Sequence, residues 1–181
     1  MKPPYEWAGN KARCLGIVLH RYFQEMTRQG LDIWDTKNLE SVAPAFQTAL
    51  LAEGLAPTDL KEALTDGMTA LRNILEDAIG RNILGRHEDD HSEYALTQVD
   101  GNRFVNKIID RTYVEDGVRW IIDYKTGKHE GGNLERFFRE EKERYQPQLE
   151  GYANLIRLTG ETRPIKKALY YPMHQRQLEI D

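Results

Sequence analysis

One carboxylate and one ammonium group stand two residues apart in a stretch of strong β-forming character. Asp123 and Lys125 flank Tyr124 and follow the apolar pair Ile121 and Ile122. Because side chains alternate along a strand, Asp123 and Lys125 are expected on the same face of it. A carboxylate there can hold a divalent cation, and the neighbouring ammonium can orient a water or stabilise developing negative charge. The pattern therefore predicts a hydrolytic centre on this strand.

A second carboxylate, Asp110, lies near the end of the preceding predicted strand. The dipeptide Asp116-Gly117 between the two strands predicts a tight hairpin, which would bring Asp110 and Asp123 together. Two carboxylates that share a site repel each other unless a cation or a proton lies between them. Oxygen ligands of this kind suit Mg²⁺ or Mn²⁺. The alternative is a surface hairpin with solvated charges, because the D-x-K pattern alone is short.

The elements that must position these residues follow from periodicity and turn signals. Helices are predicted over residues 11–29, 42–51, 58–79 and 134–159, and strands over 93–99, 103–114, 118–124, 165–171 and 176–180. Pro147 would either kink the last helix or open a second one. This order predicts an α/β (mixed α+β) fold, in which a central mixed sheet with an antiparallel meander is flanked by helices.

Length and composition limit the organisation of the chain and the classes of function. With 181 residues we expect one domain, with a linker-like stretch over residues 1–10. No apolar run is long enough to cross a bilayer, which predicts a soluble protein without a membrane partner. The net charge of -4 argues against binding nucleic acid by overall basicity, so any such contact must be local. Cys14 is the only cysteine, which excludes an internal disulfide and a four-cysteine iron–sulfur cluster.

Five separated segments resemble, in order, the motifs of RecB-like nucleases of the PD-(D/E)XK superfamily. They are Leu15 to His20 for the G-x-x-x-H helix, Ile109 to Arg111 for the aspartate strand, Asp123 to Gly127 for D-Y-K-T-G, Gln148 to Tyr152 for Q-x-x-x-Y, and Leu169 to Pro172 for the closing strand. The resemblance spans most of the chain. It implies a restriction-endonuclease-like fold.

The resemblance also implies a role for each matched residue. The metal ligands would be His20, Asp110, Asp123 and the backbone carbonyl of Tyr124, and Lys125 would be the catalytic lysine. One or two Mg²⁺ or Mn²⁺ ions would be bound, without an iron–sulfur cluster. For His20, the alternative is a half-buried histidine on an amphipathic helix.

Three further residues complete the expected site. Glu93, at the start of the first predicted strand, could bind the metal directly or through water, or could simply be solvated. Gln148 and Tyr152 are four residues apart and so share one helix face, from which they could contact Lys125 or a DNA phosphate. Without the motif, they would be a polar residue beside a core tyrosine.

The activity implied by the resemblance is Mg²⁺-dependent hydrolysis of DNA phosphodiesters, with exonuclease action on single-stranded ends favoured over endonuclease action. Such domains commonly form the C-terminal part of UvrD-like helicases, as in the exodeoxyribonuclease V beta and AddA subunits. We therefore expect a domain excised from a helicase-nuclease of DNA repair or recombination in the bacterial cytoplasm, with helicase domains in cis or in a partner subunit. One alternative is a catalytically inactive nucleic-acid-binding module of the same fold. Another is an α/β interaction domain that binds no metal tightly.

Overall fold

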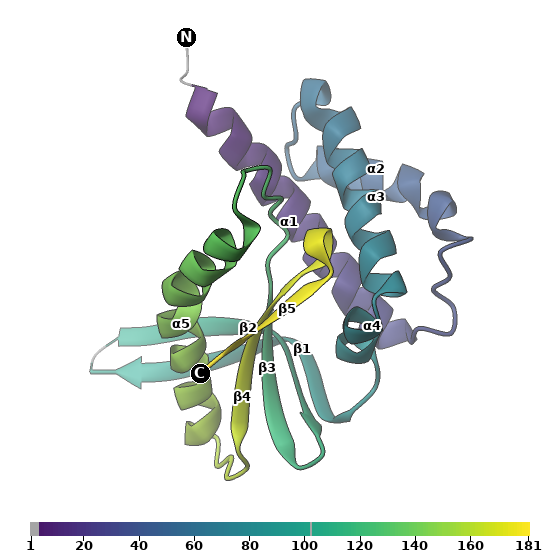
Figure 1. Cartoon of the computed structure of the whole chain (residues 1–181). Helices are drawn as coiled ribbons and strands as arrows, with labels where there is room; N and C mark the ends of the chain where they lie inside the picture. The colour runs from purple at the N-terminus through teal and green to yellow at the C-terminus, as the bar shows by residue number, and fades with distance from the viewer. Residues whose placement is uncertain (1–3, 102) are drawn as a thin grey trace. The chain divides into compact units, whose positions relative to one another are not determined.

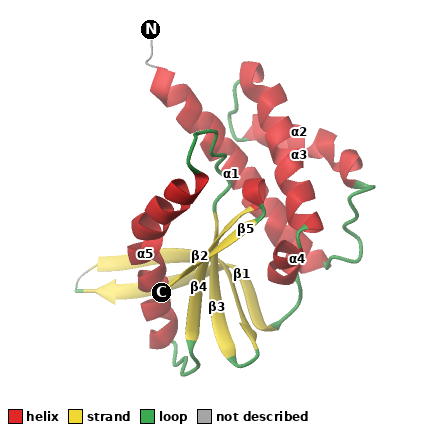
Figure 2. Cartoon of the chain, viewed as in Figure 1, coloured by secondary structure: helices red, strands yellow, loops and turns green. Residues whose placement is uncertain are grey.

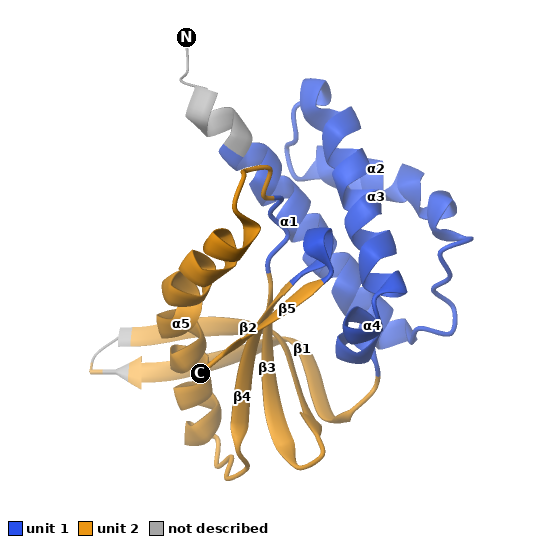
Figure 3. Ribbon diagram, in the orientation of Figure 1, with its two compact units in different colours: residues 1–85, 125–128, 171–175 blue, residues 86–124, 129–170, 176–181 orange. Residues whose placement is uncertain are grey.

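Two compact units make up the chain in the computed structural model, which describes residues 4–101 and 103–181. Unit 1 comprises the described residues up to 85 with 125–128 and 171–175, and unit 2 comprises 86–124, 129–170 and 176–181 (Figure 3). Unit 1 is helical, whereas unit 2 holds the strands and one helix (Figure 2). None of the helices in the described ranges combines the length and the apolar character that crossing a membrane requires.

Unit 1 is built from α-helices and short 3-10 turns. These are α1 (Pro4–Gln29), η1 (Leu39–Val42), α2 (Ala43–Ala52), η2 (Pro57–Asp59), α3 (Leu60–Glu76), α4 (Ala78–Leu84) and η3 (Pro172–His174) (Figure 1). α2 and α3 approach closely at Gly67, where a Cβ atom would stand 2.4 Å from the ring of Phe46. Asn73 of α3 donates a hydrogen bond to the carbonyl oxygen of Pro172 at 3.0 Å and so holds η3 against the helices.

The helix boundaries of unit 1 differ from the predicted ones at two places. α1 begins at Pro4, so residues 4–10 of the expected linker are helical, and residues 1–3 lie outside the described residues. The helix predicted over residues 58–79 is broken at Asp77, whose carboxylate accepts the backbone N–H groups of Ile79 and Gly80 at 3.4 and 3.1 Å. A short side chain that caps a helix start competes with continuation of the preceding helix. Hydrophobic periodicity runs through this break and does not reveal it.

Unit 2 contains one mixed sheet with the strand order β1-β2-β3-β4-β5. The strands are β1 (Glu88–Asp100), β2 (Arg103–Glu115), β3 (Val118–Tyr124), β4 (Ile165–Tyr171) and β5 (Arg176–Ile180) (Figure 1). β1–β2 and β2–β3 pair antiparallel, and β3–β4 pair parallel. The predicted α/β fold with a mixed sheet and an antiparallel meander is confirmed. Only β1 begins well before its predicted start.

Helix α5 (Leu134–Leu158) makes the crossover that a parallel pair of strands requires. Its first turn is capped by Asn133, whose side-chain oxygen accepts the backbone N–H of Arg136 at 2.9 Å. Pro147 lies inside a single continuous helix, so it does not open a second one. The residues that follow Pro147 bury an apolar face that includes Leu149 and Ala153.

A network of ion pairs joins β1, β3 and the loop before β4. Arg119 is only 5% exposed and contacts the carboxylates of Asp89 and Glu161, the second at 2.9 Å. Burial acts to raise the pKa of Glu161, but hydrogen bonds from the backbone N–H of Arg163 and from Arg119 outweigh it and leave that pKa lowered. The pKa of Asp89 is also lowered, mainly by its hydrogen bond with Arg119. Both carboxylates therefore stabilise the fold in their ionised form.

This network predicts a loss of stability in acid. A carboxyl group with a lowered pKa in the folded state contributes stability that is present above its unfolded pKa of about 4 and is lost as the pH falls through the folded value. Glu161→Gln should flatten this pH dependence and lower the free energy of unfolding at neutral pH by about 1.5–3 kcal/mol, as expected for a lost hydrogen bond to a charged group. Urea denaturation at a series of acidic and neutral pH values measures both effects. Glu179→Gln, which alters an exposed pair with Lys166, is the control. A pH profile identical in wild type and Glu161→Gln would contradict this account.

Candidate metal centre

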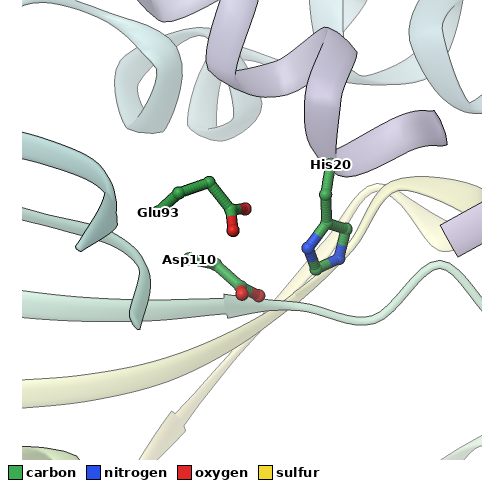
Figure 4. Close-up of side chains that lie close together, drawn as sticks. All are labelled: His20, Glu93 and Asp110. Atoms are coloured by element: carbon green, nitrogen blue, oxygen red, sulfur yellow. The ribbon is translucent and has the colours of Figure 1, made fainter. Parts of the chain in front are cut away.

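The carboxylates of Glu93 and Asp110 face each other across β1 and β2. The antiparallel register is the same on both sides of these two positions, where the flanking pairs are Ser92 with Arg111 and Tyr94 with Ile109. Residues directly opposite each other in an antiparallel pair place their side chains on one face of the sheet. The ligand oxygens of Glu93 and Asp110 accordingly lie within 4.8 Å of each other. Figure 4 draws these carboxylates together with His20, which belongs to unit 1.

Glu93 has an unusual backbone conformation for a residue inside a strand. Its φ angle is 52°, in the left-handed region that residues with a Cβ atom rarely adopt. Glu93 lies within β1, which begins at Glu88, and the predicted position at the start of the strand was therefore wrong. Such a conformation is strained and persists only where surrounding structure enforces it, and strain of this kind is concentrated at functional sites. Here it occurs at the carboxylate that faces Asp110.

Asp110 also connects the first two strands to the third. Its Oδ2 atom accepts the backbone N–H of Tyr124 at 2.8 Å. The register that pairs Arg111 with Ile122 places Asp123 opposite Asp110. The turn that sets this register has positive φ angles at its two central residues, 51° at Asp116 and 74° at Gly117, as a tight type I′ hairpin requires. Three neighbouring strands therefore bring three carboxylates to one region of the sheet.

Asp123 is held in place by α5. It is only 3% exposed, and the amide nitrogen of Gln148 donates to its Oδ1 atom at 2.9 Å. The same amide nitrogen donates to the hydroxyl of Tyr152 at 2.8 Å, since one amide group carries two protons. Gln148 thus contacts a candidate metal ligand. Its contact with Lys125 or a DNA phosphate stays a prediction.

The phenol of Tyr152 is kept protonated by its surroundings. Burial raises its pKa most, the hydrogen bond from Gln148 acts in the opposite direction, and the charges of Asp123, Asp110 and Glu93 raise the pKa further. The net effect is a raised pKa, so the hydroxyl is neutral near pH 7. The sensitivity of Tyr152 to all three carboxylates agrees with their gathering at one place.

His20 and Lys125 belong to unit 1. His20 is a partly exposed residue of α1, and Lys125 is the first residue after β3, so the D-x-K pattern extends one residue beyond the strand. Two of the five motifs meet within unit 1: a Cβ atom on Gly16, one turn before His20, would stand 3.3 Å from the hydroxyl oxygen of Thr126. Gly16 therefore allows α1 to approach the segment that follows the lysine.

The donor set of unit 2 fits a hard divalent cation. Glu93 and Asp110 are partly exposed, so a cation can reach their oxygens from solvent. Asp123 adds a buried carboxylate from β3, and the carbonyl of Tyr124 is a further oxygen on the same strand. Oxygen donors of this kind are those that Mg²⁺ and Mn²⁺ prefer.

Phe104, Asn106 and Ile108 precede Asp110 at intervals of two, and none of them was predicted as a functional residue. They lie on β2 and share the face of Asp110. The period of two along the predicted strand was the signal that could have identified them.

The sheet defines the class of protein to which this chain is related. A mixed five-stranded sheet with an antiparallel meander and a parallel crossover is the arrangement of restriction-endonuclease-like folds. The chain belongs to the PD-(D/E)XK nuclease superfamily, whose family model matches residues 6–180. The protein is thus a nuclease in general class, and nucleases of this superfamily generally use divalent metal ions. No curated protein with a significantly similar sequence was found.

We predict that Mn²⁺ or Mg²⁺ binds at the facing carboxylates and stabilises the fold. A ligand at one hundred times its Kd raises the free energy of unfolding by about 2.7 kcal/mol. Asp110→Asn should weaken metal binding at least about tenfold, because it removes a charge but keeps an oxygen for the N–H of Tyr124. Calorimetric titration and thermal unfolding with and without the metal measure these effects. Glu88→Gln, the same kind of change at an exposed residue of β1 that pairs with Arg163, should bind metal as wild type does. Equal affinities of wild type and Asp110→Asn would rule out this site.

Proposed function

We propose that the protein is a Mg²⁺- or Mn²⁺-dependent DNA nuclease of the RecB-like kind. The observation that carries this proposal is the convergence of Glu93, Asp110 and Asp123 from three neighbouring strands, in a chain that belongs to a nuclease superfamily. The resemblance of five ordered segments to RecB-like motifs supports the narrower assignment. Exonuclease action on single-stranded ends, in DNA repair or recombination, accords with that resemblance.

The proposed ligands come from the carboxylates and from two family motifs. Asp110 and Asp123, with Glu93, would hold one ion or two, and the motifs add His20 and the backbone carbonyl of Tyr124. When bound, a divalent ion lowers the pKa of a coordinated water and neutralises charge on the phosphate. The rigid β-ladder fixes the carboxylates before substrate arrives, which reduces the reorganisation needed for catalysis.

Lys125 is proposed as the catalytic lysine on the strength of its place in the D-x-K motif. Its ammonium group would orient the attacking water or stabilise the negative charge that develops on the phosphate oxygens. Gln148 is proposed as a positioning residue, because its amide fixes the orientation of Asp123. Tyr152 supports Gln148 through the second proton of the amide, and its neutral hydroxyl adds no competing charge.

We further propose that both units act as one nuclease domain, since the family model runs through both of them. By the same resemblance, helicase domains in cis or in a partner subunit would supply an unwound strand. The bacterial cytoplasm, where chromosomal DNA lies, is the proposed location.

The lysine gives the sharpest test of catalysis. With end-labelled single- and double-stranded DNA, we expect cleavage in Mg²⁺ or Mn²⁺ and none in EDTA. Lys125→Ala should lower kcat by about 100-fold or more, as for other groups that stabilise transition-state charge, while metal and DNA binding are retained. Lys128→Ala changes a nearby exposed lysine that pairs with Asp66, and should cleave as wild type does. Equal amounts of product from wild type and Lys125→Ala would rule out the proposed catalytic site. Metal-dependent DNA binding without any cleavage by wild type would favour the inactive binding module.

The role of Gln148 can be separated from simple packing. Gln148→Leu keeps most of the side-chain volume but removes the hydrogen bonds to Asp123 and Tyr152. We expect the Mg²⁺ concentration for half-maximal activity to rise about 10- to 100-fold, as for other residues that orient metal ligands, with little change in KM for DNA. Gln146→Leu, at an exposed position of the same helix, is the matched control. If Gln148→Leu lowered only the melting temperature and left the Mg²⁺ dependence unchanged, its role would be structural.

A further inference from the structure

One face of the β1–β2 hairpin continues from the carboxylate pair out to the hairpin turn. Beyond Glu93 and Asp110, three cross-strand pairs share this face, and we call their six residues the hairpin face: Ala95 with Ile108, Thr97 with Asn106, and Val99 with Phe104. The alternation of side chains along both strands places these pairs on the same side as the carboxylates.

The hairpin face is exposed and largely apolar. Phe104 is 77% exposed, Val99 65% and Ile108 52%. Between them, the hydroxyl of Thr97 donates to the side-chain oxygen of Asn106 at 2.8 Å. The hairpin face contains no charged side chain. Exposed apolar side chains that gather on one face, here in two pairs on either side of a polar pair, mark a surface that binds a ligand or a partner.

The hairpin face lies on a ribbon that extends past the rest of the sheet (Figure 1). Pairing between β2 and β3 covers only Arg111 to Glu115 on β2, so the described part of β2 before Asp110 pairs with β1 alone. At about 3.4 Å per residue, Phe104 lies roughly 20 Å along the strand from Asp110. A ligand that follows this face from the turn would reach the carboxylates at its other end.

We propose that the hairpin face binds the bases of a single-stranded nucleic acid whose backbone continues to the carboxylates. This inference rests on the proposed nuclease function and adds the path of the substrate. A surface without cations suits uncharged bases and not phosphates, whereas apolar and aromatic side chains stack on bases regardless of sequence. A duplex buries the flat faces of its bases, so only an unpaired strand can offer them to Phe104. The face is continuous with the carboxylates, which favours the substrate strand over a protein partner.

Removal of the aromatic ring tests the proposal directly. Phe104→Ala should weaken binding of a fluorescent single-stranded oligonucleotide about fivefold or more, measured by anisotropy with Ca²⁺ replacing Mg²⁺, and should leave blunt duplex binding unchanged. Phe104→Trp should restore single-strand affinity because it returns an aromatic face. Gln98→Ala, at an exposed position on the opposite side of the same hairpin, is the matched control. Hydrolysis of bis(p-nitrophenyl) phosphate by the wild type reports on the carboxylate site alone, because this diester is too small to reach Phe104 from the carboxylates.

The outcomes of these experiments separate the base-binding role of the hairpin face from the proposed nuclease function. Equal single-strand affinities of wild type and Phe104→Ala would overturn the hairpin face as a base-binding surface. A wild-type dimer that Phe104→Ala converts to a monomer, seen by sedimentation, would show that a second copy covers the face and would also overturn it. Failure of the wild type to hydrolyse any diester would count against the nuclease function alone, since the binding measurement needs no cleavage.

Discussion

Carboxylates that face each other across an antiparallel ladder repel, and the strands must hold them in place against that repulsion. In unit 2 the register sets Glu93 opposite Asp110 and Asp110 opposite Asp123. Buried apolar side chains on the same strands, such as Ile109 and Ile122, hold the ladder together. The free energy gained by burying them is much larger than the free energy lost to one repulsive pair of carboxylates. The sheet therefore presents a concentration of negative charge that a cation can offset.

The parallel pairing of β3 with β4 also determines how the carboxylate of Asp123 is held. A parallel pair cannot be joined by a tight turn and needs a crossover, which here is α5. The crossover helix buries Leu149 and Ala153 and, on the same stretch, carries Gln148 to the carboxylate of Asp123. The element that closes the fold also orients a candidate ligand. A substitution that shifts the packing of α5 will consequently alter the orientation of Asp123, even where the substituted residue does not contact Asp123.

Much of this arrangement follows from local sequence. β3, β4 and β5 occur at their predicted positions because alternation and turn residues mark them, and the turn at Asp116 and Gly117 is enough to set Asp110 opposite Asp123. The roles of His20 and Lys125 stay predictions from motifs.

The first part of β1 could not be predicted in this way. Residues 88–93 are polar or charged and show no apolar alternation, because ion pairs with neighbouring strands hold them: Asp90 pairs with Arg111 of β2, and Asp89 with Arg119 of β3. The left-handed conformation of Glu93 and the shift of register between Glu88 and His91 likewise depend on tertiary structure.

The β1–β2 hairpin also affects the order of folding. Its pairs are close in sequence, down to Asp100 with Arg103 at the turn, whereas Arg119 of β3 must find Ile165 of β4 across a long connection. Hairpins close within microseconds, and pairings between distant segments form more slowly. We therefore expect the carboxylates of Glu93 and Asp110 to meet early, while water still surrounds them and screens their repulsion. The folded chain then holds at one partly exposed site a pair of charges that met in a high-dielectric environment.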